Sequence, residues 1–119
     1  MTLRLLLVRH GLSTFNQEHK IQGRNDLSTL TEEGELQALQ AGRALAEVPF
    51  TAVYSSPLQR ASATTKILLK QRNDDLNPIY ETNLLEVNLS KWSGLTIDEV
   101  KSKFPEDYLT WCKSPKDLV

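Results

Sequence analysis

The chain has a single cysteine, no long apolar run and almost no net charge. Because Cys112 is the only cysteine among 119 residues, an internal disulfide is excluded and a reducing cytoplasm is favoured. The longest apolar run, Leu5 to Val8, is far shorter than the ~20 residues of a membrane helix. The 14 basic and 15 acidic residues give a formal charge of −1, without the basic excess of nucleic-acid binders. We therefore expect a cytoplasmic protein with no nucleic-acid and no membrane partner.

The composition, 39% apolar and 24% charged, is typical of a folded globular chain and predicts one domain. Apolar or β-favouring segments predict strands at 3–8, 51–55 and 78–81. Capping signals predict helices from Thr31 to about Glu47, and from a Ser56-Pro57-Leu58-Gln59 capping box to about Arg72. Two shorter helices are expected after Thr96 and from Pro105.

This strand–helix–strand–helix–strand order predicts an α/β fold with a parallel sheet. Small side chains on one face of the first long helix should let it approach that sheet closely: Gly34, Ala38, Ala41, Gly42 and Leu45. The chain ends at Val119 without a closing strand, so we expect residues 1–119 to be the N-terminal part of a single larger domain.

Chemically active residue types gather where the predicted strands end. Arg9, His10 and Gly11 follow the first strand, Arg60 lies in the first turn of the helix after the second, and Glu86 follows the third. The carboxyl ends of parallel strands share one edge of a sheet, where sites of open α/β folds form. We expect these residues to meet there.

Their chemistry indicates phosphoryl transfer. Two guanidinium groups, of Arg9 and Arg60, can hold a phosphoryl group through paired hydrogen bonds. Between them, a neutral His10 can attack phosphorus with one ring nitrogen while a backbone acceptor holds the other N–H. Glu86 can give a proton to the leaving alkoxide. His19 is expected to be a surface residue, and two histidines nine positions apart do not predict a metal site.

Four ordered motifs resemble the histidine phosphatase superfamily, which contains the cofactor-dependent phosphoglycerate mutases. The first is Leu7-Val8-Arg9-His10-Gly11-Leu12-Ser13-Thr14-Phe15-Asn16, and the second is Gln22-Gly23-Arg24-Asn25-Asp26, followed by Leu30-Thr31-Glu32-Glu33-Gly34 with Gln37-Ala38. The third is Tyr54-Ser55-Ser56-Pro57-Leu58-Gln59-Arg60-Ala61 with Thr64-Thr65, and the fourth is Leu85-Glu86 with Trp92-Ser93-Gly94-Leu95-Thr96.

The resemblance implies a three-layer α/β/α sandwich around a mostly parallel sheet, present here only in part. It also implies that His10 becomes the phosphohistidine, that Arg9 and Arg60 bind the phosphoryl group, and that Glu86 is the proton donor. Asn16, Gly23 and Ser13 would bind substrate. The chain departs from the family at Leu12-Ser13, where members usually carry Glu-Thr, and no second pocket histidine follows His19.

Three functions stay open at this point. The leading one is a phosphomonoesterase that needs no cofactor and no metal. The second is a cofactor-dependent phosphoglycerate mutase, primed by 2,3-bisphosphoglycerate, and the third is a module that binds phosphorylated ligands without turnover. The expected partner is a small phosphorylated substrate, with a homodimer as an open oligomeric state. The isolated 1–119 segment is expected to have little activity.

Overall fold

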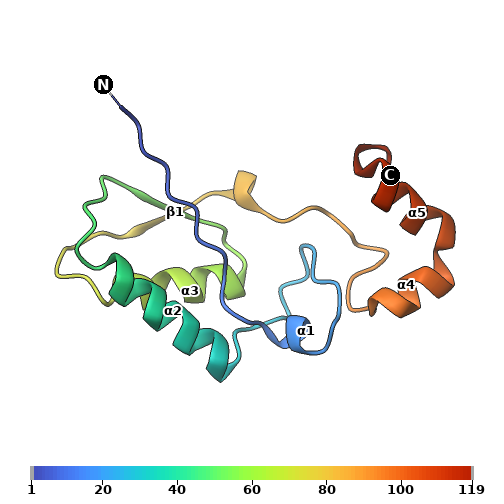
Figure 1. Cartoon of the computed structure of the whole chain (residues 1–119), viewed down its shortest axis with the longest axis horizontal. Coiled ribbons are helices and arrows are strands. Elements are labelled where there is room, and N and C mark those ends of the chain that lie inside the picture. Colours follow the sequence, from blue (N-terminus) through green and yellow to red (C-terminus); the bar gives the residue numbers. More distant parts are fainter. Residues whose placement is uncertain (1, 119) are drawn as a thin grey trace.

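The computed structural model describes residues 2–118 and contains five helices, two strands and two short 3-10 turns (Figure 1). In chain order these are α1 Thr14–Gln17, α2 Glu32–Leu45, β1 Val53–Ser55, α3 Gln59–Leu69, β2 Pro78–Tyr80, η1 Thr82–Leu84, α4 Ile97–Lys103, α5 Pro105–Lys113 and η2 Pro115–Asp117. Within this part of the chain, no helix is long and apolar enough to cross a membrane.

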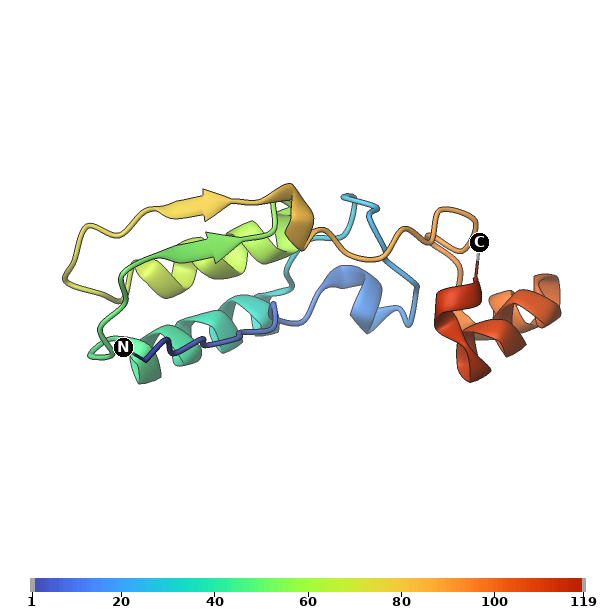
Figure 2. The same cartoon turned by 90° about the horizontal axis from the view of Figure 1, so that it is seen from above.

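Strands β1 and β2 pair in parallel, as the element order predicts, with Tyr54 opposite Ile79. Helix α3 connects them and lies against one face of the pair, and α2 packs on the far side of α3 (Figure 2). A Cβ on Gly42 would lie 2.9 Å from the Cα of Leu68, so α2 and α3 approach closely only because Gly42 has no side chain. Of the small face of α2, expected to contact a sheet, Gly42 therefore contacts α3, whereas Gly34 contacts the backbone of Gly11 and Leu12.

Helices α2, α4 and α5 begin where the sequence predicts. The hydroxyl of Thr31 accepts a hydrogen bond from the backbone N–H of Gly34 at 3.0 Å, and Thr96 does the same for Glu99 at 3.1 Å. Pro105 is the first residue of α5, where no backbone donor is needed. These helix starts depend on signals within four residues of sequence, which explains why they are predictable.

Helix α3 begins three residues after Ser56, and the predicted Ser56 capping box is wrong. Its first residue, Gln59, donates its backbone N–H to Oδ1 of Asp26 at 2.7 Å, and its side-chain amide donates to the Asp26 carbonyl at 2.7 Å. A carboxylate from a distant loop thus takes the place of the local cap. Arg60 still lies in the first turn of the helix, as predicted.

The predicted strand at 3–8 is also wrong for the residues that the structure describes. Leu3 is 91% exposed and Leu7 84% exposed, and no strand is assigned there. A strand forms only when a neighbour takes its backbone hydrogen bonds, and none of residues 2–118 does so for this segment.

Tyr54 and Ile79 are likewise exposed on the pair β1–β2. The radius of gyration, 16.5 Å, exceeds the roughly 13.5 Å expected of a compact domain of this length.

Candidate active site

The imidazole of His10 is half-buried at the end of the exposed N-terminal segment. Its Nδ1 lies 2.6 Å from the carbonyl oxygen of Gly11. A carbonyl only accepts hydrogen bonds, so Nδ1 carries the proton and Nε2 of the neutral ring keeps its lone pair. This is the tautomer that a nitrogen nucleophile requires.

The glycine after His10 is tied to helices α2 and α3. The backbone N–H of Gly11 donates to the hydroxyl of Thr64 at 3.1 Å, and that hydroxyl donates to the carbonyl of Arg60 at 2.7 Å. On its other side Gly11 touches Gly34 of α2 so closely that a Cβ on either residue would collide with backbone atoms. The backbone beside His10 is therefore fixed from two sides.

Arg60 is only 2% exposed, and its guanidinium is held by one loop. One terminal nitrogen donates to the carbonyl of Gly23 at 2.8 Å, and the other donates to the carbonyl of Asn25 at 3.3 Å. These bonds use two of the five N–H donors of the side chain, and the other three make no hydrogen bond within residues 2–118. Arg60 is a preorganised cation rather than a solvated surface residue.

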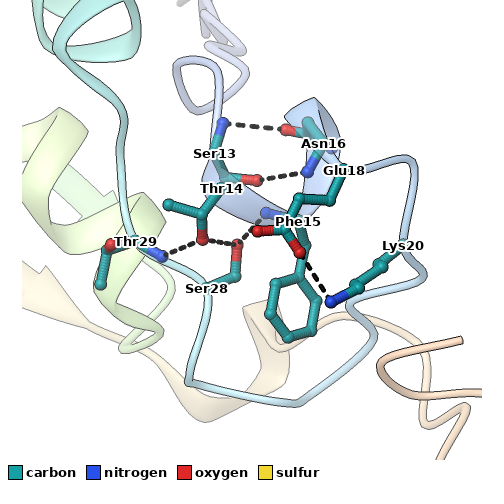
Figure 3. Close-up of polar contacts among 8 residues, drawn as sticks. All are labelled: Ser13, Thr14, Phe15, Asn16, Glu18, Lys20, Ser28 and Thr29. Carbon is teal, nitrogen blue, oxygen red and sulfur yellow. Dashed lines mark hydrogen bonds and ion pairs between the residues drawn. The ribbon is translucent and has the colours of Figure 1, made fainter.

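The segment after Gly11 is held by a cluster of buried hydroxyl groups, part of which Figure 3 shows. Ser13 caps α1: its hydroxyl accepts from the N–H of Asn16 at 3.2 Å, and Oδ1 of Asn16 accepts from the N–H of Ser13. The hydroxyl groups of Ser13 and Ser28, both on fully buried residues, donate to Oε1 of Gln22 at 2.6 and 2.7 Å. Ser13, predicted to bind substrate, is itself fully buried, and its hydroxyl is bonded to Gln22.

Gly23 and Glu86 lie on two irregular segments that contact each other. Gly23 has a φ of 52°, which favours glycine, and a Cβ there would lie 3.2 Å from the carbonyl oxygen of Val87. The carbonyl of Glu86 accepts a hydrogen bond from Nε of Arg24 at 2.7 Å. The Glu86 side chain is exposed and accepts from the N–H of Val87 at 2.9 Å.

The charges of these groups act on one another. Burial is the largest cause that lowers the pKa of His10 from its ordinary 6.5, and the positive charges of Arg60 and Arg9 lower it further. The Gly11 carbonyl and the negative charge of Glu86 act in the opposite direction. Burial likewise lowers the pKa of Arg60, against the opposing carboxylates of Glu86 and Asp26. A lowered pKa keeps His10 neutral at neutral pH. The arrangement therefore holds an unprotonated imidazole within the electrostatic influence of a fixed cation and a carboxylate.

Arg9 stays at the rim of this arrangement. It is exposed and shares with His10, Gly11 and Thr64 a hollow of about 90 Å³ at the side of α2. A larger hollow, about 290 Å³, lies between segment 87–92 and α5, and no predicted site residue lines it.

His19 is exposed, as predicted. Within residues 2–118, no three His, Cys, Asp or Glu side chains gather as metal ligands would.

Sequence reasoning assigned no role to Gln22, Ser28 or Thr64. Thr64 lies one helical turn after Arg60, so the helical period could have placed both on the buried face. Gln22 stands in the second of the four motifs, but the bonds of Gln22 and Ser28 follow no helix or strand period, because they join residues 6, 9 and 13 positions apart.

Comparisons with known proteins agree with this geometry. The family model of the histidine phosphatase superfamily (branch 1) matches residues 5–119. The 2-carboxy-D-arabinitol-1-phosphatase of Triticum aestivum is 40% identical over 114 residues, which cover 96% of this chain and 23% of that protein. A 2,3-bisphosphoglycerate-dependent phosphoglycerate mutase of Bartonella tribocorum is 39% identical over 114 residues, 92% of this chain and 55% of that protein.

The structure of YhfR from Bacillus stearothermophilus superposes with a TM-score of 0.84 at 31% identity, over 93% of this chain and 54% of that one. The chain thus spans about a quarter of the plant enzyme and about half of the bacterial proteins. The predicted α/β fold, present in part, is confirmed. The chain belongs to the histidine phosphatase superfamily (branch 1).

Proposed function

We propose that this chain supplies the nucleophile, one fixed phosphate-binding cation and the proton donor of a phosphomonoesterase. The single observation that carries the proposal is the hydrogen bond from Nδ1 of His10 to the Gly11 carbonyl. It leaves Nε2 unprotonated in a ring whose pKa is lowered by burial and, further, by the positive charge of Arg60.

The reaction has two steps. First, the Nε2 lone pair of His10 attacks phosphorus, the ester P–O bond breaks, and Glu86 gives its proton to the leaving alkoxide. Arg60, with Arg9 at the rim, stabilises the charge on the phosphoryl oxygens. Second, water attacks the phosphohistidine, its proton passes to the Glu86 carboxylate, and the P–N bond breaks to release inorganic phosphate.

Asn16 and Gly23 are proposed to shape the substrate site, Gly23 through its backbone. No metal or organic cofactor enters these steps, and the substrate is a small phosphate ester. A cytoplasmic location fits the single, exposed Cys112.

A phosphoglycerate mutase is the second candidate, because one of the similar proteins carries that name. A mutase must keep water away from its phosphohistidine while the bisphosphorylated intermediate turns over. Such a pocket calls for strong positive charge, and the segment from Glu86 to Thr96 offers a single cation, Lys91. This favours hydrolysis.

The test is an assay of the full-length protein on a panel of phosphomonoesters and on 3-phosphoglycerate, with and without 2,3-bisphosphoglycerate. We expect phosphate release to exceed isomerisation. Isomerisation that outpaces phosphate release and depends on 2,3-bisphosphoglycerate would establish the mutase. Tight binding of phosphate esters without either reaction would establish a binding module.

A further inference from the structure

The loop Gly23–Asn25 contacts both the phosphate-binding cation and the segment of the proton donor. Arg60 donates to the carbonyls of Gly23 and Asn25, at 2.8 and 3.3 Å. Between these two residues, Arg24 donates from Nε to the carbonyl of Glu86 at 2.7 Å. The loop and the segment after η1 lie beside each other in Figure 1. The loop Gly23–Asn25 is therefore hydrogen-bonded to both Glu86 and Arg60, and it couples the positions of these two residues.

The segment around Glu86 has little other support of its own. Residues 85–89 lie between η1 and α4 and form no helix or strand. Glu86 is exposed, and its carboxylate bonds only to the adjacent N–H of Val87 among the contacts of residues 2–118. The bond from Arg24 reaches the backbone of Glu86 itself, so it fixes the point from which the carboxylate side chain extends.

The side chain of Arg24 is built into no ion pair. Among residues 2–118, the two salt bridges are Lys20–Glu18 and Arg72–Asp74. Its role is therefore not explained by a carboxylate partner, and its one hydrogen bond within the described chain is to Glu86.

We propose that Arg24 is a positioning residue that holds Glu86 at the distance from the phosphoryl site at which it can protonate the leaving alkoxide. This inference rests on the proposed function. Arg24 takes no part in bond making: the proton moves from the Glu86 carboxyl group to the ester oxygen as the P–O bond breaks, and Arg24 sets where that carboxyl group stands.

A leaving-group comparison separates positioning from general support. An aryl ester such as p-nitrophenyl phosphate leaves as a stable phenolate and needs little protonation, whereas an alkyl ester such as glycerol 3-phosphate needs a full proton. In the full-length protein, Arg24→Met removes the donor and keeps the length of the side chain as far as the position of Nε. We expect kcat/KM to fall on the order of fivefold for the alkyl ester, the effect of one ordinary hydrogen bond, and to change less than about twofold for the aryl ester.

Two further variants identify the atom responsible. The amide nitrogen of Gln occupies the same place along the side chain as Nε of Arg, so Arg24→Gln should restore most of the alkyl activity without the charge. In a Glu86→Gln background, Arg24→Met should cause no further loss. Arg43→Met, an exposed arginine of α2, is the matched control and should change neither activity.

Equal losses on both esters, no loss on either, or rescue by Arg24→Lys but not by Arg24→Gln would each overturn the positioning role. Thermal unfolding of each variant checks that the fold is intact. Failure of the unchanged protein to release phosphate from either ester would overturn the proposed function itself, and the role of Arg24 with it.

Discussion

Replacing Arg60 by lysine keeps the positive charge but removes the planar group that the site holds. The side chain is 2% exposed, and its two terminal nitrogens donate to different carbonyls, those of Gly23 and Asn25. A lysine ammonium is a single point that cannot reach both carbonyls and also face a phosphoryl group with a fork of donors.

Two separate losses follow from Arg60→Lys. Losing one charge-assisted hydrogen bond to a buried carbonyl lowers the free energy of unfolding by about 1.5–3 kcal/mol. Losing a preorganised donor to the transition state costs about 2.7–4 kcal/mol, which lowers kcat roughly 10²–10³-fold. The first loss is measured by urea unfolding, and the second by steady-state kinetics below the temperature at which the variant unfolds.

Arg72 provides a matched control for this experiment. It also donates to two backbone carbonyls, those of Leu45 and Val48 at 2.6 Å each, and its side chain is 4% exposed. It is not among the site residues, so Arg72→Lys should destabilise the fold by a similar amount and leave kcat of the folded protein unchanged. If Arg60→Lys and Arg72→Lys have the same kcat, the reasoning about Arg60 is refuted.

Three further outcomes are expected. Burial lowers the pKa of His10 from 6.5, and only the neutral ring attacks phosphorus. The midpoint of the acid limb of the kcat/KM profile, corrected for substrate ionisation, should therefore lie below pH 6.5, and a midpoint above that value would contradict the assignment. Gly34→Ala should destabilise the fold by about 1–3 kcal/mol in urea unfolding, because the new Cβ meets the carbonyl of Leu12, and unchanged stability would show that the two segments are not in contact. Ser28→Ala leaves the N–H of Phe15 without its 3.2 Å acceptor and removes one of the donors to Gln22. The free energy of unfolding should therefore fall by about 1–3 kcal/mol, whereas Ser62→Ala on α3 should have a much smaller effect.

The parts of the fold that the sequence predicts are those encoded within a few neighbouring residues. Thr31 and Thr96 cap their helices through bonds to residues three positions later, and Pro105 begins the next helix. The prediction fails where distant residues decide the outcome. Asp26 caps α3 in place of Ser56, and the 3–8 segment has the composition of a strand but no neighbour to pair with in the described structure.

The candidate site follows the same division. Residue type and topology predict that Arg60 lies in a first helical turn, and this is observed. The close contact of Gly11 with Gly34 was not predicted, because it joins two segments that are distant in sequence. The supporting bonds of Gln22, Ser28 and Thr64 were not predictable, because each joins segments that become neighbours only in the folded chain. The chemical roles of His10, Glu86 and the arginines stay predictions.

The most direct test of the central claim is to look for phosphate on His10. The full-length protein is mixed with a labelled phosphomonoester, quenched at alkaline pH, where phosphohistidine survives, and digested for mass spectrometry. We expect a phosphorylated His10 that forms and decays within one turnover and that is absent, together with phosphate release, in His10→Ala. Full turnover by His10→Ala, or label on another residue at the same rate, would contradict the account.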